Sequence, residues 1–166
     1  NGRHEWFWEP DDDDNIYPLT TLMTMYEKSV GRNATLILGL TPDPTGLIPP
    51  GDVERLKEFG NEINRHFSSP IAYTSGQKKS LLLEMKQKQP INYCIIQENI
   101  KKGERIRQYK IEARVDGKWK TVCQGESVGH KRIEKFAPIE TNALKLTITE
   151  SIAPPDIINF SAYSVE

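Results

Sequence analysis

The sequence lacks the features that mark several functional classes. It has two cysteines and three histidines in 166 residues, too few for a disulfide framework or a conventional zinc site. No apolar run approaches the roughly 20 residues that a membrane-spanning helix needs. The formal net charge of −1 provides no general attraction to nucleic acid or anionic membranes. We therefore expect no metal, no other cofactor, no nucleic-acid partner and no membrane span.

The two cysteines and the first residue carry limited information. Cys94 and Cys123 fall in segments that we predict to be strands, and we expect buried free thiols, with a single bridge between strands as the alternative. The chain begins with Asn1 rather than Met and shows no signal-peptide pattern. This start is what we expect of a fragment or of a processed chain.

Helical periodicity dominates the first 67 residues. One apolar face predicts a helix that starts after Pro18, and a second predicts a helix that ends near Phe67. The first face consists of Leu19, Leu22, Met23, Tyr26 and Val30, and the second of Val53, Leu56, Phe59, Ile63 and Phe67. Between them, the apolar run at residues 34–40 predicts a strand buried on both faces, and residues 41–51 predict a rigid loop rich in proline and glycine.

Helix, buried strand, loop and helix in this order are typical of one turn of an α/β barrel. A complete (β/α)8 barrel needs about 250 residues, and residues 1–67 contain one clear strand. That strand alone would have two unpaired edges and two uncovered faces. We therefore expect the remainder of the barrel as a partner, either upstream sequence or a second chain.

From residue 68 onward the apolar pattern alternates with a period of two. Several short alternating segments separated by turns predict an antiparallel β-sandwich over residues 68–166. Asp116-Gly117 is a strong signal for a tight hairpin. The predicted strands cover residues 81–85, 91–97, 109–115, 119–123, 144–149 and 157–165.

An acidic run follows an aromatic cluster near the start of the chain. Trp6, Phe7 and Trp8 precede Glu9, and Pro10 separates Glu9 from four aspartates at residues 11–14. A carboxylate run alone is most often a solvated loop. Beside tryptophan, however, carboxylates form the composition of a sugar site, because rings stack on sugar C–H faces while carboxylates bind hydroxyl groups. Retaining glycosidases need two carboxyl groups about 5–5.5 Å apart, one as nucleophile and one as acid/base.

Together with residues 28–36 and 41–48, this cluster resembles the C-terminal end of the catalytic barrel in family 29 α-L-fucosidases. The resemblance implies a retaining exo-α-L-fucosidase that removes terminal α-L-fucose from fucosylated glycans. It places Trp8 at the second position of the family's aromatic pair, with Trp6 beside it as a substrate-binding residue. It gives Asp12 or Asp11 the acid/base role, with Glu9 as the remaining candidate.

The same resemblance places the nucleophilic aspartate on an earlier barrel strand, outside this chain. The 166-residue chain is therefore expected to be inactive without the rest of the barrel. An extracytoplasmic location (secreted, periplasmic or lysosomal) is also what the resemblance implies.

The second half resembles the discoidin or galactose-binding-like sandwich that follows the fucosidase barrel. We expect Trp119 in the core of that sandwich rather than as a sugar platform. The rival interpretation of the whole chain is a non-catalytic carbohydrate-binding or structural module. The matching residues lie at 95–100, 103–106, 109–112, 116–119, 129–133 and 136–139.

Overall fold

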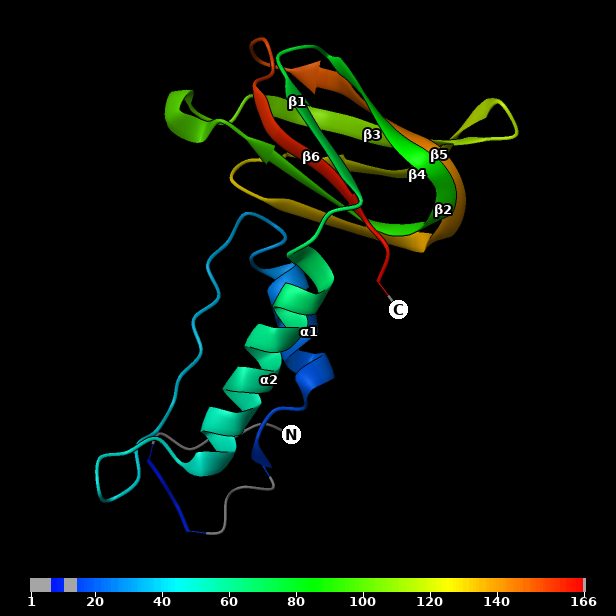
Figure 1. Cartoon of the computed structure of the whole chain (residues 1–166). Coiled ribbons are helices and arrows are strands. Elements are labelled where there is room, and N and C mark those ends of the chain that lie inside the picture. Colours follow the sequence, from blue (N-terminus) through cyan, green and yellow to red (C-terminus); the bar gives the residue numbers. More distant parts are fainter. Residues whose placement is uncertain (1–6, 11–14, 166) are drawn as a thin grey trace.

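The computed structural model describes residues 7–10 and 15–165. Two helices lie side by side at one end of the molecule, and six antiparallel strands form the rest (Figure 1). The helices are α1 (Leu19–Lys28) and α2 (Pro50–Phe67). The strands are β1 (Ala72–Gly76), β2 (Ser80–Glu98), β3 (Ile106–Val115), β4 (Lys118–Glu126), β5 (Arg132–Ser151) and β6 (Ile157–Tyr163), with a 3-10 turn, η2 (Ile100–Lys102), between β2 and β3.

Both predicted helices are confirmed. Proline precedes α1 and opens α2, where its fixed φ suits a helix start and its missing N–H costs no hydrogen bond. Asp52 in the first turn of α2 and the basic residues in its last turn complement the helix dipole. The two helices bury a small apolar cluster between them, centred on Leu22, Met23 and Phe59.

The six strands form a single sheet in the order β1-β6-β2-β5-β3-β4. The pairing of β2 with β5 breaks between Glu84 and Gln89 and then resumes. The first part of β2 lies beside the part of β5 that also pairs with β3, whereas the second part of β2 also pairs with β6. The two long strands therefore pass from one layer to the other, and the sheet folds over on itself.

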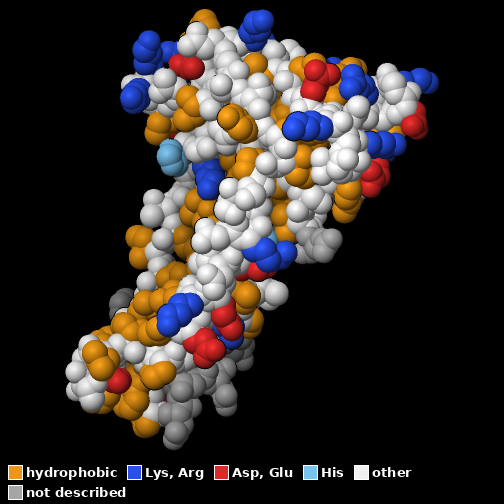
Figure 2. Space-filling model, viewed as in Figure 1, with side chains coloured by type: hydrophobic (Ala, Val, Ile, Leu, Met, Phe, Trp, Pro, Cys, Tyr) orange, Lys and Arg blue, Asp and Glu red, His pale blue; other side chains and the backbone are white. Residues whose placement is uncertain are grey.

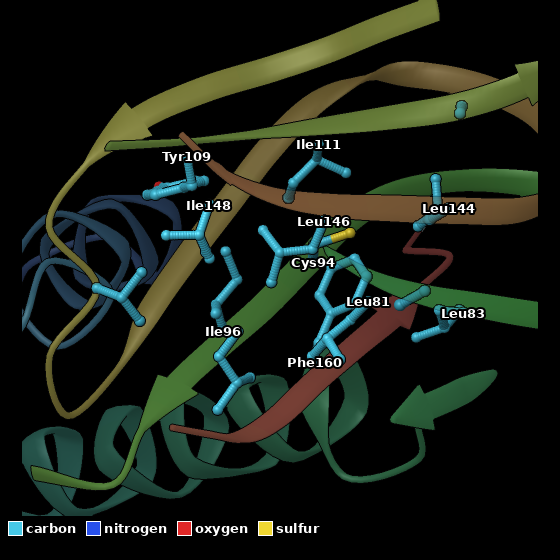
Figure 3. Packing of buried hydrophobic residues seen from close by; sticks show 14 of the residues in the cluster. Leu81, Leu83, Cys94, Ile96, Tyr109, Ile111, Leu144, Leu146, Ile148 and Phe160 are labelled. Atoms are coloured by element: carbon cyan, nitrogen blue, oxygen red, sulfur yellow. The ribbon is translucent and has the colours of Figure 1, made fainter. Parts of the chain in front are cut away.

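The main core lies between these two layers (Figure 3). Ile96 and Phe160 come from the β2–β6 side, and Ile111, Leu146 and Ile148 come from the β3–β5 side. All five side chains are at most 3% exposed. This burial supplies the hydrophobic contribution that holds the layers together.

The predicted antiparallel β-domain is confirmed, but its layers belong to one continuous sheet. Predicted strands at 81–85 and 91–97 are one long strand, β2, because the chain bends at a register shift instead of ending. The Asp116-Gly117 hairpin is confirmed, and both residues have positive φ, 49° and 76°, as a tight two-residue hairpin turn requires.

The predicted barrel strand is not formed. Residues 34–41 are assigned to neither helix nor strand, and no barrel is evident in the part of the chain that the structure describes. The side chain of Ile37 is 86% exposed. A parallel-sheet strand forms only against neighbouring strands, and residues 34–41 have none among the described residues. The apolar composition of this segment therefore predicted a strand that the chain does not form.

Two smaller expectations have different outcomes. Cys94 and Cys123 are both free, as expected. Burial raises the pKa of Cys123 to about 12 and that of Cys94 well above its usual value, so neither is a reactive thiolate. Trp119, expected in the core, is 36% exposed.

Neither helix of the described chain is long and apolar enough to cross a membrane.

Candidate functional site

Only part of the predicted sugar site falls within the described residues. Trp6, Asp11 and Asp12 lie outside them. Trp8 is partly buried and Glu9 is exposed, and both stand in irregular chain before α1. That these carboxylates and tryptophans lie close together in space therefore stays a prediction from the sequence.

The chain that follows the acidic run at residues 9–14, called the acidic loop below after its predicted role, is held by the two helices. Arg55 on α2 donates a hydrogen bond of 2.8 Å from Nη1 to the backbone oxygen of Tyr17, directly before α1. The same guanidinium forms an ion pair of 2.8 Å with Glu58. Arg55 thus holds the residue before α1 against α2. Helical periodicity in the sequence did not predict this contact.

A cleft of about 550 Å³ lies next to this exit. Its walls are apolar side chains of both helices and of the segment predicted to be a barrel strand, with a few polar groups near α2. Figure 2 shows hydrophobic side chains gathered over the same helical end of the molecule. The lining residues are Asn15, Ile16, Tyr17, Leu22, Met25, residues 36–41, Asp52, Arg55 and Leu56.

Two large apolar side chains that line the cleft are exposed, Ile37 at 86% and Leu40 at 39%. Exposed apolar side chains that line an apolar cleft are typical of an interaction surface. The helical end therefore has the character of a face that another part of a protein covers.

The helices are joined to the sheet through a hydrogen bond and aromatic packing. Tyr93 on β2 donates a hydrogen bond of 2.7 Å from its hydroxyl to Glu27 on α1. Burial and this carboxylate raise the pKa of Tyr93, so it stays a donor. Phe67 at the end of α2 packs its ring against Tyr93 and Tyr163, with centroid distances of 5.7 Å for both pairs.

A second junction follows α1 directly. Gly31 accepts a backbone hydrogen bond of 2.9 Å from Ile133, and Arg32 forms an isolated bridge with Arg132 at the start of β5. The Arg32 guanidinium lies 3.5 Å from the carboxylate of Glu134. That carboxylate is buried and also accepts a hydrogen bond from Tyr109 and one of 2.7 Å from Arg132.

This network holds the turn at residues 31–33 against the start of β5. Residues more than 100 positions apart meet there, which local periodicity cannot show. No cluster of three or more histidine, cysteine, aspartate or glutamate side chains suited to a metal ion occurs in residues 7–10 and 15–165.

Comparisons with known proteins give the family. The chain is 78% identical to the structure of a "putative alpha-L-fucosidase" from Bacteroides thetaiotaomicron, with a TM-score of 0.98 over 100% of this chain and 38% of that one. It is 28% identical to α-L-fucosidase 1 of Arabidopsis thaliana over 97% of this chain and 39% of that protein. A GH29 fucosidase from Ruminococcus gnavus in complex with fucose is 25% identical, with a TM-score of 0.84 over 98% of this chain and 40% of that one. No protein-family model matches the sequence.

The chain corresponds to a portion of a family 29 α-L-fucosidase. It spans about two fifths of the length of each of these relatives. The resemblance drawn from the acidic loop and the alternating strands is thereby confirmed at the level of the family. The roles of individual residues in the acidic loop stay predictions, because their geometry lies largely outside the described residues.

Proposed function

We propose that this chain is part of a retaining exo-α-L-fucosidase that hydrolyses terminal α-L-fucose from glycans. The observation that carries the proposal is the 78% identity and TM-score of 0.98 over the whole chain with the Bacteroides thetaiotaomicron protein. The fucose bound to the Ruminococcus gnavus relative supports fucose as the sugar. The chain would contribute the acid/base loop and the C-terminal β-domain.

The chemistry assigned to the loop is general acid/base catalysis. In a retaining mechanism, one carboxylic acid protonates the leaving oxygen and then deprotonates the attacking water, while a second carboxylate forms the glycosyl intermediate. Asp12, Asp11 and Glu9 are the candidates for the first role, and Trp6 and Trp8 for stacking against the sugar. The nucleophile belongs to the barrel outside this chain, and the mechanism needs no metal or cofactor.

The partner that completes the enzyme is the remainder of the catalytic barrel. It would pair with residues 34–40, cover Ile37 and close the cleft between the helices. Burial of Ile37, now 86% exposed, would contribute about 2 kcal/mol. An extracytoplasmic location belongs to the same proposal, since it follows from the family resemblance.

A chimera tests the proposal. This chain replaces the corresponding segment of the Bacteroides thetaiotaomicron protein, and turnover of an aryl α-L-fucoside is measured for parent and chimera. We expect a folded chimera with a rate within about tenfold of the parent, a difference of roughly 1.4 kcal/mol in the barrier. The 166-residue chain alone should show no turnover.

Two outcomes would count against the proposal. A folded but inactive chimera beside an active parent would show that this chain does not supply a working acid/base loop. It would favour the rival interpretation of a non-catalytic binding or structural module. Turnover by the isolated chain, free of contaminating glycosidase, would show that the nucleophile is not missing.

A further inference from the structure

The outer face of the β5-β3-β4 layer carries a tryptophan where the sequence predicted a core residue. Trp119 on β4 pairs in register with Arg114 on β3, next to Ala113, which is buried on the inner face. Because side chains alternate along a strand, Arg114 and Trp119 lie on the outer face. Trp119 is 36% exposed there, so part of its large apolar ring is in contact with solvent.

The ring is held in place by a charged network. Lys145 on β5 places its Nζ 4.5 Å from the centroid of the Trp119 ring, a cation–π contact. The same Nζ lies 3.0 Å from Glu112, whose other carboxylate oxygen lies 3.1 Å from Nζ of Lys110. Glu112 is only 8% exposed, so the network orients Trp119 through a buried carboxylate.

A hollow of about 490 Å³ lies on the same layer, on the other side of Lys110. Its walls carry amide, hydroxyl, ammonium and carboxylate groups, a mixture of donors and acceptors. Its lining residues are Gln108, Tyr109, Lys110, Gln124, Gly125, Glu126 and Thr149. Lys110 belongs both to this hollow and to the network that holds Trp119, so ring and hollow form one surface.

Charges on this surface are balanced. Its cations are Lys110, Lys145 and Arg114, and its anions are Glu112, Glu126 and Glu84, which lies 3.9 Å from Arg114. A balanced surface does not favour a polyanion or a polycation. A preoriented aromatic ring beside many hydrogen-bonding groups suits a ligand with apolar C–H faces and many hydroxyl groups.

We propose that this outer face is a binding site for a neutral oligosaccharide, with Trp119 as the stacking platform and the hollow at Gln108, Gln124 and Thr149 as the hydrogen-bonding subsite. The proposed site is formed by residues of β3, β4 and β5, and none of them belongs to the acidic loop. It rests on the proposed function only for the choice of a fucosylated probe. In a longer enzyme it would hold a glycan chain while another part of that chain is hydrolysed.

The test is titration of the 166-residue chain with 2′-fucosyllactose and with lactose, followed by saturation-transfer NMR and calorimetry. We expect a dissociation constant in about the millimolar range. Trp119→Ala should weaken binding at least about tenfold because it removes the ring on which the sugar stacks, and Trp119→Phe should retain part of the binding because a smaller ring remains. Gln124→Ala should weaken binding severalfold.

Tyr73→Ala is the control variant for this site. It removes a residue of β1, at the opposite edge of the sheet and 75% exposed, and it should bind normally. Unchanged thermal unfolding of Trp119→Ala would exclude a folding defect. The proposal is overturned if no probe binds at about 10 mM or if Trp119→Ala binds like the parent chain. None of these results would affect the chimera experiment.

Discussion

Tyr93 on β2 donates a hydrogen bond of 2.7 Å to the carboxylate of Glu27 on α1, across 66 residues of sequence. This bond lies at the junction between the helical segment and the sheet, beside the ring of Phe67. The helix that follows the acidic loop is therefore attached directly to the β-domain. If the loop carries the acid/base residue, the sheet helps to fix its position.

Removal of the Tyr93 hydroxyl should weaken that junction. Tyr93→Phe keeps the aromatic packing and removes the hydrogen bond to a charged acceptor, which typically contributes about 1.5–3 kcal/mol. We expect the free energy of unfolding in urea to fall by about 1–2 kcal/mol, toward the lower end because Glu27 is only partly buried. Tyr73→Phe, at a position 75% exposed, is the matched control and should be neutral. Equal effects of the two variants would show that the bond contributes nothing.

A glycine immediately after α1 is required by close packing. A Cβ at Gly31 would lie 2.4 Å from the backbone oxygen of Glu27 and 2.9 Å from Cβ of Ile133. Gly31→Ala should therefore lower the free energy of unfolding by about 2 kcal/mol or more, the range of overpacked sites.

Gly39→Ala is the control for that substitution. A Cβ at Gly39 meets no atom within 4 Å, so this variant should be within about 0.5 kcal/mol of the parent chain. Thermal and urea unfolding of both variants measure the difference. A neutral Gly31→Ala would mean that the junction between α1 and β5 adjusts without cost.

His66 should make stability depend on pH. Its side chain is 10% exposed, its Nε2 lies 3.0 Å from Glu62, and its Nδ1 is buried without a hydrogen-bond partner among the described residues. Burial lowers the pKa of His66, and Arg65 adds to this, against the opposing effects of Glu62 and Glu27. The folded state therefore binds fewer protons than the unfolded state, in which the pKa is about 6.5.

The direction of this pH dependence follows from the lower number of protons bound by the folded state. The contribution of His66 is fully present above about pH 6.5 and is lost as the pH falls through the lower folded-state pKa. Below about pH 6.5, His66→Gln should reduce the slope of the free energy of unfolding against pH. His130→Gln, at an exposed position, should leave this slope unchanged. The contribution of Glu62, whose pKa is lowered from 4.5 to about 2 chiefly by the hydrogen bond from Arg65, is fully present above about pH 4.5 and is lost as the pH falls toward 2. The two groups therefore act in different pH ranges. Identical slopes for both histidine variants would contradict this account.

The exposed Ile37 offers a test of the proposed barrel partner. Ile37→Asp should change the stability of the isolated chain by less than about 0.5 kcal/mol, because the side chain is already in solvent. In the chimera it should lower the melting temperature or the yield of folded protein, because a buried unpaired charge is costly. Leu22→Ala, which removes a buried contact between α1 and α2, should destabilise both proteins. Equal behaviour of Ile37→Asp in chain and chimera would show that the barrel does not cover this segment.

Leaving-group dependence should identify the acid/base residue. In the chimera, Asp12→Asn should slow substrates with poor leaving groups far more than activated aryl fucosides, because general acid catalysis contributes about 10²–10⁴-fold when the leaving oxygen needs a proton. Azide should restore turnover of the activated substrate, since an anionic nucleophile needs no general base.

Asp11→Asn and Glu9→Gln are the matched variants for that measurement. Leaving-group dependence with azide rescue in Glu9→Gln, and not in Asp12→Asn, would move the assignment to Glu9. The absence of this signature in all three variants would place the acid/base residue outside this chain and leave the loop with a binding or structural role.

The sequence by itself determined what depends on near neighbours. Helical spacing predicted α1 and α2, alternation predicted the antiparallel strands, and Asp116-Gly117 predicted the hairpin between β3 and β4. The aromatic and acidic residues near the start, together with residues 28–36 and 41–48, indicated the family, because such motifs are local.

Tertiary structure decided what depends on distant neighbours. Residues 34–40 have the composition of a buried strand but form none, because a strand needs partners that the described chain does not provide. The folding of one sheet into two layers depends on register shifts in β2 and β5, and Trp119 lies on the outer face because pairing with Arg114 fixes its side. The Arg32–Glu134 and Tyr93–Glu27 contacts join residues 102 and 66 positions apart. Such contacts form only when the whole chain folds, so no local pattern in the sequence encodes them.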